Sequence, residues 1–351
     1  MDCATPARPD AQSLWETLPV YFRQAASPIR RFLQDTDVIE ICVNRPGEVW
    51  IEALGRPAME LFAVPEMTGE AIERLATHVA SITSQSVNSS TPLLSAAMPH
   101  GERFQGVLGP ATPYGGGFSI RKQVIANLTL ADYERIGGFE DVRVRGPKKP
   151  ERDEYPEIET ELAERLKDPS PAAIRAALEF AVLNHVTMII SGGTSPGKTT
   201  FLNALLKTVP ETERVITIED TRELTPPQPN WLALVASKGS QGLAQVTVQD
   251  LLEASLRLRP DRLFLGEIRG AEAATFLQAV NTGHPGSLTT LHADSAHGAF
   301  QRLALMTLQS ELKLTRSEIL EYVHSVVPMV VQLRRRPTRG VAEIYFRGYG
   351  A

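Results

Sequence analysis

Gly192-Gly193-Thr194-Ser195-Pro196-Gly197-Lys198-Thr199-Thr200 is the stretch that decides the fold of this chain. It matches G-x-x-x-x-G-K-[ST], a pattern whose backbone amides cradle the phosphates of a nucleotide. An apolar segment over Val186–Ser191 precedes it, and a helical pattern over Lys198–Val209 follows it. The motif therefore has the strand-turn-helix context that it requires, and we predict that it binds ATP in an α/β domain.

The parts of this loop have separate roles. Small residues let the backbone close around phosphate, and the helix N-terminus adds positive potential. We expect Lys198 to reach the β- and γ-phosphates and the Thr199 hydroxyl to ligate Mg²⁺. Pro196 departs from the usual composition because it has no N–H to donate and restricts the backbone of Ser195. We expect it to weaken or restrict nucleotide binding without abolishing it.

Two further apolar segments end in carboxylates. Arg262–Arg269 reads as a buried strand followed by Gly266 and Glu267, where a Walker B strand usually has Asp before Glu. We predict that Glu267 positions the attacking water or holds magnesium; the alternative is an ordinary carboxylate at a strand end. Val215–Glu223 places Glu219 and Asp220 after a strand, and ligands of parallel sheets bind at that edge. A solvated charge run is the alternative there.

A fourth segment, Gly286–Ser295, ends a predicted strand at His292. This histidine could contact the γ-phosphate, although a histidine at a strand end is more often structural. Strands and helices alternate from Val186 to Leu291, which indicates a largely parallel sheet. We assign residues 171–351 to this ATPase domain.

The first part of the chain reads as a smaller α+β domain, residues 1–135. Strands are expected over Val38–Val43, Val49–Ile51, Arg103–Leu108 and Gly117–Arg121, with a helix over Thr68–Ser84 capped by Thr68. Residues 136–170 are dense in charges of both signs and contain four prolines. We predict a charged linker there, with a short helix over Ile158–Leu166.

Composition limits the possible functions. The 351 residues carry 36 basic and 41 acidic side chains, a net charge of −5, so a strong permanent grip on nucleic acid is not expected. The two cysteines cannot form a disulfide scaffold and fit a reducing compartment. No signal peptide pattern and no apolar run of membrane-spanning length is evident. We expect a cytoplasmic protein that docks at a membrane through partners.

The four motifs, in this order, resemble those of the hexameric type II/type IV secretion traffic ATPases. That family has a P-loop, an acidic Asp box, a Walker B motif with Gly-Glu and a His box, which here are GGTSPGKTT, ITIEDTREL, LFLGEIRG and SLTTLHADS. Shorter stretches, among them Phe118–Lys122 and Glu343–Phe346, most resemble the VirB-type ATPases of type IV secretion and plasmid conjugation.

The resemblance implies a RecA-like ATPase domain in a double-ring homohexamer. It also implies Mg²⁺ and ATP as cofactors, and partners among the inner-membrane components of a secretion or conjugation machine. It assigns catalysis to Lys198, Glu219, Glu267 and His292, and magnesium to Thr199, Glu219 and Glu267. Arg121, and less directly Arg103, match N-terminal arginines that approach the phosphates. The alternatives are a nucleotide-gated scaffold with slow turnover and a DNA-translocating motor, for which Arg334–Arg336 is a local basic patch.

Overall fold

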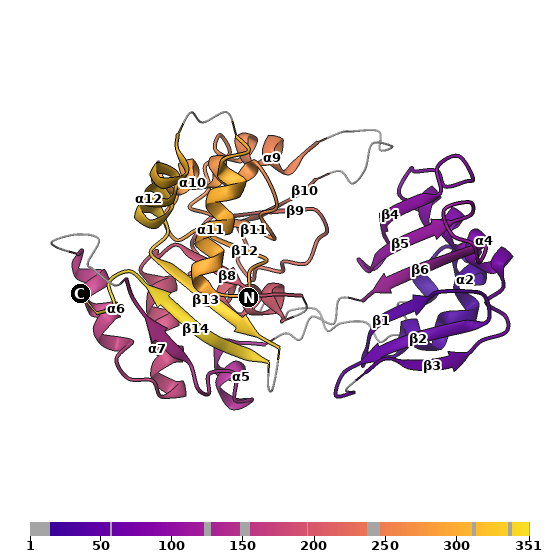
Figure 1. Cartoon of the computed structure of the whole chain (residues 1–351), viewed down its shortest axis with the longest axis horizontal. Coiled ribbons are helices and arrows are strands. Elements are labelled where there is room, and N and C mark those ends of the chain that lie inside the picture. Colours follow the sequence, from indigo (N-terminus) through magenta and orange to yellow (C-terminus); the bar gives the residue numbers. More distant parts are fainter. Residues whose placement is uncertain are drawn as a thin grey trace. The chain divides into compact units, whose positions relative to one another are not determined.

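The computed structural model describes residues 15–56, 58–122, 128–147, 155–194, 196–236, 246–310, 314–335 and 339–350. The chain divides into two compact units, with the main boundary between Ile125 and Ala126 (Figure 1). Unit 1 holds the described residues before this boundary, and unit 2 holds those after it. Each unit has its own hydrophobic core, so each is described by itself.

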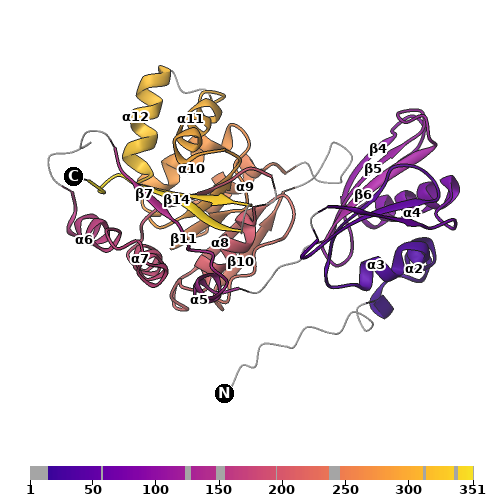
Figure 2. The same ribbon diagram turned by 60° about the horizontal axis from the view of Figure 1, so that its bottom comes forward.

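Unit 1 is built on a six-stranded antiparallel sheet in the order β3-β2-β1-β6-β5-β4. The strands are β1 (Val38–Val43), β2 (Glu48–Ala53), β3 (Glu60–Ala63), β4 (Leu93–Ala97), β5 (Arg103–Leu108) and β6 (Gly116–Arg121). One face packs against α2 (Val20–Ala26), η1 (Ser27–Ile29), α3 (Arg30–Gln34) and α4 (Gly69–Ile82) (Figure 2). Burial alternates along β2 and β5, because successive side chains point to opposite faces, and in β1 a register shift between Val38 and Glu40 interrupts the alternation.

Helix α4 follows directly from its sequence. The Thr68 side chain accepts a hydrogen bond from the Ala71 N–H, as expected of its N-cap. Ile72, Leu75 and Val79 are fully buried on one face of the helix. Ile82 continues the same spacing but is 40% exposed, since it is the last residue of the helix.

Unit 2 contains an eight-stranded sheet in the order β10-β9-β11-β12-β8-β13-β14-β7. All neighbouring strands are parallel except the β13–β14 pair. The strands are β7 (Arg143–Arg145), β8 (Met188–Ser191), β9 (Val215–Glu219), β10 (Trp231–Val235), β11 (Arg262–Leu265), β12 (Leu288–Leu291), β13 (Met329–Arg334) and β14 (Gly340–Phe346). The central strands are buried along their length, as expected of a parallel sheet covered on both faces.

Helices cover both faces of this sheet (Figure 1). One core cluster includes α5 (Leu130–Arg135), α6 (Glu157–Arg165), α7 (Pro171–Leu183) and α8 (Lys198–Leu206). The other includes α9 (Val248–Ser255), α10 (Glu272–Asn281), α11 (Ala296–Thr307) and α12 (Arg316–Val326). None of the helices in the described ranges has the length and apolar character needed to cross a bilayer.

The fold class expected from the sequence is confirmed: a mostly parallel α/β unit accompanies a smaller α+β unit. The β13–β14 hairpin was not foreseen. Its strand β13 joins the sheet beside β8, with Met329 opposite Met188 and Gln332 opposite Ser191. Only this pairing makes the apolar segment 329–333 a strand, because nothing in its local spacing distinguishes it from a helix.

The charged segment expected as a linker contributes two elements to unit 2. Strand β7 pairs with β14, and helix α6 buries Leu162 in the core. Glu159 of α6 is buried too, and its carboxylate is held by the Arg347 guanidinium, with Nε 2.8 Å from Oε2. A few apolar residues at helical spacing and one paired charge are therefore enough to dock α6 despite its polar composition.

Candidate functional site

The phosphate-binding motif joins β8 to α8. Gly197 is the N-cap of α8 and has φ = 90°, a left-handed conformation that favours glycine. Pro196 is buried, and its Cγ lies 2.7 Å from the position that a Cβ would take at Gly192. Gly192 is therefore required by the proline ring as well as by the loop. Ser195 lies outside the described residues; Gly193, Thr194, Thr199 and Thr200 are all at least partly accessible.

The Lys198 side chain points into the loop that precedes it. Its Nζ donates to the carbonyl oxygens of Gly192 at 3.3 Å and Gly193 at 3.2 Å. It also lies 3.2 Å from Nδ1 of His292. The P-loop lysine and the His box, nearly a hundred residues apart in sequence, are therefore in direct contact.

A chain of polar contacts continues from His292 to the other two motifs. His292 Nε2 lies 3.2 Å from Oε1 of Glu267. Oε2 of Glu267 accepts a hydrogen bond from Arg269 at 2.9 Å, and the same guanidinium donates to Asp220 at 2.8 Å. The four motifs thus converge at the carboxyl edge of the sheet, as the strand order requires.

The contacts of His292 favour a neutral ring. Lys198 Nζ lies 3.2 Å from Nδ1 and 3.3 Å from Nε2 of His292, and because the ammonium only donates, the ring nitrogen that accepts from it carries a lone pair. Burial, and next the charge of Lys198, hold the pKa of His292 below its usual value, which favours the neutral ring.

Glu219 occupies the space beside the unusual glycine of the Walker B motif. A Cβ at Gly266 would lie 3.2 Å from Cγ of Glu219, on the neighbouring strand. Oε1 of Glu219 accepts hydrogen bonds from the N–H groups of Glu223 and Leu224, each at 2.8 Å. Oε2 is buried without a hydrogen-bond partner among the described residues. Burial raises the pKa of this carboxyl to about 7.

The residues fit a magnesium ion that arrives with a nucleotide. In the described ranges there is no group of three or more His, Cys, Asp or Glu side chains able to hold a metal. Mg²⁺ commonly takes one or two carboxylates and completes its shell with phosphate oxygens and water. The unpartnered Oε2 of Glu219 is a suitable oxygen donor, so Glu219, Glu267 and Thr199 form a sparse set of the expected kind.

The two arginines expected to approach the phosphates belong to unit 1. Arg103 and Arg121 are direct cross-strand partners on β5 and β6. Glu40 of β1 is in turn the partner of Arg121, and Glu52 of β2 is the partner of Glu40. This row lies on the sheet face opposite the helices, because the alternate residues Phe104 and Ile120 are buried in the core.

Comparison with known proteins identifies the family. Residues 166–337 match the family model described as "Type II/IV secretion system protein". The type IV secretion system protein VirB11 of Bartonella quintana is 36% identical over 329 residues, covering 91% of both chains. The chain belongs to the type II/IV secretion system protein family. VirB11 of Brucella suis is 37% identical over 331 residues, covering 93% of this chain and 88% of the relative.

Solved structures agree with this membership. The crystal structure of the VirB11 ATPase from the Brucella suis type IV secretion system has 34% identity and a TM-score of 0.50, covering 95% of this chain and 96% of that one. The pilus retraction motor PilT, at 16% identity and a TM-score of 0.53, shares the fold. The alignment covers 94% of this chain and 83% of PilT. The protein is accordingly a secretion ATPase, an ATP hydrolase with the α/β fold of this family.

Arg269 contacts two carboxylates of the secretion ATPase site, although its motif alone gave it no role. Its guanidinium joins Glu267 to Asp220. The sequence feature that could have indicated this contact is the position of Arg269, two residues after Glu267, because it places a cation beside a carboxylate at the same strand end.

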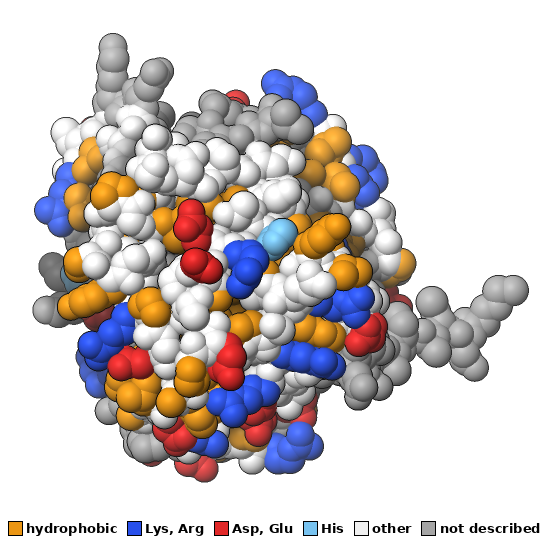
Figure 3. Space-filling view, turned by 90° about the vertical axis from the view of Figure 1, so that its right-hand side faces the viewer, with side chains coloured by type: hydrophobic (Ala, Val, Ile, Leu, Met, Phe, Trp, Pro, Cys, Tyr) orange, Lys and Arg blue, Asp and Glu red, His pale blue; other side chains and the backbone are white. Residues whose placement is uncertain are grey.

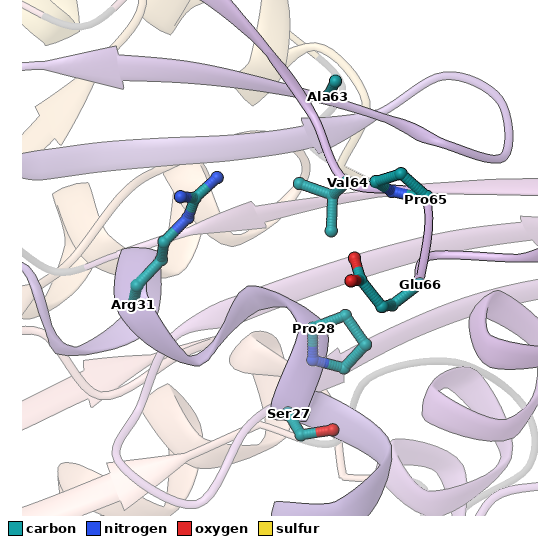
Figure 4. A pocket seen from close by; sticks show the side chains of 7 residues that line it. All are labelled: Ser27, Pro28, Arg31, Ala63, Val64, Pro65 and Glu66. Carbon is teal, nitrogen blue, oxygen red and sulfur yellow. The ribbon is translucent and has the colours of Figure 1, made fainter.

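Unit 1 also contains a pocket of about 480 Å³ (Figure 4). Its walls are η1 and α3 on one side and the segment after β3 on the other, with Arg31 and Glu66 as its charged residues. None of the four motifs contributes to it, so we do not assign it to nucleotide.

Proposed function

We propose that this protein is a type IV secretion ATPase in which Mg²⁺ and ATP bind at Gly192–Thr200. The observation that carries the proposal is the continuous set of contacts from Lys198 through His292 and Glu267 to Asp220. A P-loop lysine and carboxylates at the carboxyl edge of a parallel sheet are groups that position and stabilise phosphoryl transfer to water.

Each residue takes a defined part in the proposed reaction. Lys198 leaves the carbonyls of Gly192 and Gly193 and neutralises the β- and γ-phosphates. Thr199 and Glu219 would hold magnesium, which would supply charge neutralisation at the phosphates. Glu267 orients the attacking water, and neutral His292 donates toward the γ-phosphate in place of Glu267. Arg103 and Arg121 add positive charge to the phosphates from unit 1.

The pairing of Glu267 with His292 and Arg269 defines a resting arrangement. In it, the carboxylate that orients water already accepts a hydrogen bond from Arg269 at 2.9 Å and lies 3.2 Å from Nε2 of His292. Nucleotide draws Lys198 and His292 to the phosphates and thereby releases one of these contacts. The rest of the proposal is that hydrolysis drives rigid-body motion of the two units in a homohexamer at the inner membrane.

The test compares wild type with Glu267→Gln and Lys198→Ala in steady-state ATP hydrolysis, with mass measured in the same buffer plus Mg²⁺ and ATP. We expect wild type to hydrolyse ATP as a hexamer. Glu267→Gln should lose at least about a hundredfold in turnover while still binding ATP. Lys198→Ala should lose both ATP binding and turnover. Assembly and tight binding by wild type without turnover would instead indicate a nucleotide-gated scaffold.

Contact with nucleic acid is not part of the proposal. On the face shown in Figure 3, Lys and Arg side chains are interspersed with Asp and Glu. Arg334, the first residue of the basic patch noted in the sequence, donates to the Glu140 carbonyl at 2.6 Å. Stimulation of ATP hydrolysis by DNA would contradict this view.

A further inference from the structure

A buried glutamine outside the four motifs contacts the turn that carries His292. Gln332 of β13 is 7% exposed, and its neighbours Val330, Val331 and Leu333 are buried hydrophobic residues. Its Nε2 donates to the carbonyl of Ala293, the residue after His292, at 3.2 Å. The same amide lies 3.4 Å from the Leu333 carbonyl. The carboxamide therefore ties β13 to the His292–Asp294 turn.

The end of β13 that carries Gln332 also lies against the start of the phosphate-binding loop. Gln332 is the parallel-strand partner of Ser191, which immediately precedes Gly192. A Cβ at Gly192 would lie 3.4 Å from the backbone oxygen of Leu333. A Cβ at Gly193 would lie 3.7 Å from Oδ1 of Asp294. The phosphate-binding loop, the His292–Asp294 turn and the end of β13 therefore meet at Gln332.

A glutamine at this position costs stability. Its Oε1 is buried with no hydrogen-bond partner in the part of the chain that the structure describes. A buried amide oxygen without a partner destabilises the folded state, and an apolar side chain of the same size would avoid that cost. Packing alone therefore does not explain Gln332, whereas holding the Ala293 carbonyl does.

We propose that Gln332 is a positioning residue that fixes the His292–Asp294 turn against the phosphate-binding loop and so places the His292 ring for hydrolysis. The inference rests on the proposed role of His292. Gln332 itself touches none of the reacting atoms, so its effect passes through His292. Its loss should then slow turnover without weakening the capture of nucleotide by Lys198 and the loop amides.

The experiment uses the full-length chain with Gln332→Met, which preserves length and removes the amide donor. We expect kcat to fall about fivefold to tenfold, the change that corresponds to one lost buried hydrogen bond, and KM for ATP to stay within about twofold. Thermal unfolding is measured in parallel, so that loss of folded protein is separated from loss of turnover.

Gln228 provides a matched control. It is 2% exposed, its Nε2 donates to the carbonyls of Leu206 and Val209 at 3.0 and 2.8 Å, and its Oε1 is likewise buried. It lies at the far end of α8 from the phosphate-binding loop. Gln228→Met removes two buried hydrogen bonds, so it should change the melting temperature at least as much as Gln332→Met but leave kcat within about twofold of wild type.

A double-mutant cycle with His292→Ala decides whether Gln332 acts through His292. We expect Gln332→Met to reduce kcat in wild type and to have no further effect in His292→Ala. The inference would be overturned if the reductions in kcat caused by Gln332→Met and His292→Ala multiply in the double variant. It would also be overturned if Gln332→Met has the same kcat as Gln228→Met. If His292→Ala itself turns over ATP like wild type, the proposed role of His292 fails, and the inference fails with it.

Discussion

The carboxyl of Glu219 makes the stability of unit 2 depend on pH in an unusual direction. Its pKa is raised from the ordinary value of 4.5 to about 7, because burial disfavours the ionised form. In the unfolded chain the same group ionises at its ordinary value. Between these two values the folded state therefore holds a proton that the unfolded state has lost, so stability falls as pH rises.

The magnitude follows from the difference of about 2.5 between the two pKa values. Each unit corresponds to about 1.36 kcal/mol, so above pH 7 the ionised carboxylate lowers the free energy of unfolding by about 3 kcal/mol. Below about pH 4.5 the cost is absent. Glu219→Gln imitates the protonated acid: it keeps an oxygen to accept from Glu223 and Leu224 and removes the charge. The variant should exceed the stability of wild type by less than about 1 kcal/mol near pH 5 and by about 3 kcal/mol at pH 8.5.

The assay is urea unfolding of the nucleotide-free protein at pH 5 to 8.5, followed by the fluorescence of Trp231. This tryptophan lies in unit 2, where it donates to Thr217 Oγ1 on the strand that ends in Glu219. Replacing Trp15 and Trp50 of unit 1 by phenylalanine makes the signal specific to unit 2. Glu211→Gln, at an exposed position of the same unit, is the control and should show no pH-dependent gain. A stability difference between Glu219→Gln and wild type that stays constant from pH 5 to 8.5 would refute the reasoning.

Three further predictions concern the site. Gly266→Asp restores the usual Walker B sequence but places a Cβ 3.2 Å from Cγ of Glu219. We expect kcat to fall by about tenfold or more. A rise in kcat would show that Glu219 does not take the place of the usual Walker B aspartate. Pro196→Gly regains a backbone donor and should bind ATP at least as tightly as wild type by titration calorimetry, whereas clearly weaker binding would contradict the proposed cost of the proline. Arg103→Ala and Arg121→Ala should each raise KM for ATP by about tenfold, the loss of one charge-assisted hydrogen bond, with Glu52→Gln in the same sheet row as the control.

The sequence by itself determined the presence of the phosphate-binding loop, the parallel α/β sheet and the residues at its strand ends. These features are local: small residues in a fixed order, apolar runs of strand length, and Thr68 as a helix cap. The same local signals identified Glu219, Glu267 and His292 as candidates without showing that they meet. Composition alone predicted that the charged segment 136–170 is a linker. It does not reveal that Arg347, distant in sequence, pairs with Glu159 and helps to hold α6 in unit 2.

Only the tertiary structure decided which of these residues touch. The order β9-β11-β12-β8 brings the ends of four strands side by side and so joins Lys198 to His292 and Glu267. The tertiary structure also places Glu219 of the neighbouring strand against Gly266, where an added Cβ would lie 3.2 Å from its Cγ. Strand β13 carries Gln332 to the same edge from near the C-terminus. Such contacts depend on the pairing of strands distant in sequence, and the free energy of that pairing comes from burial across the whole sheet rather than from any one segment.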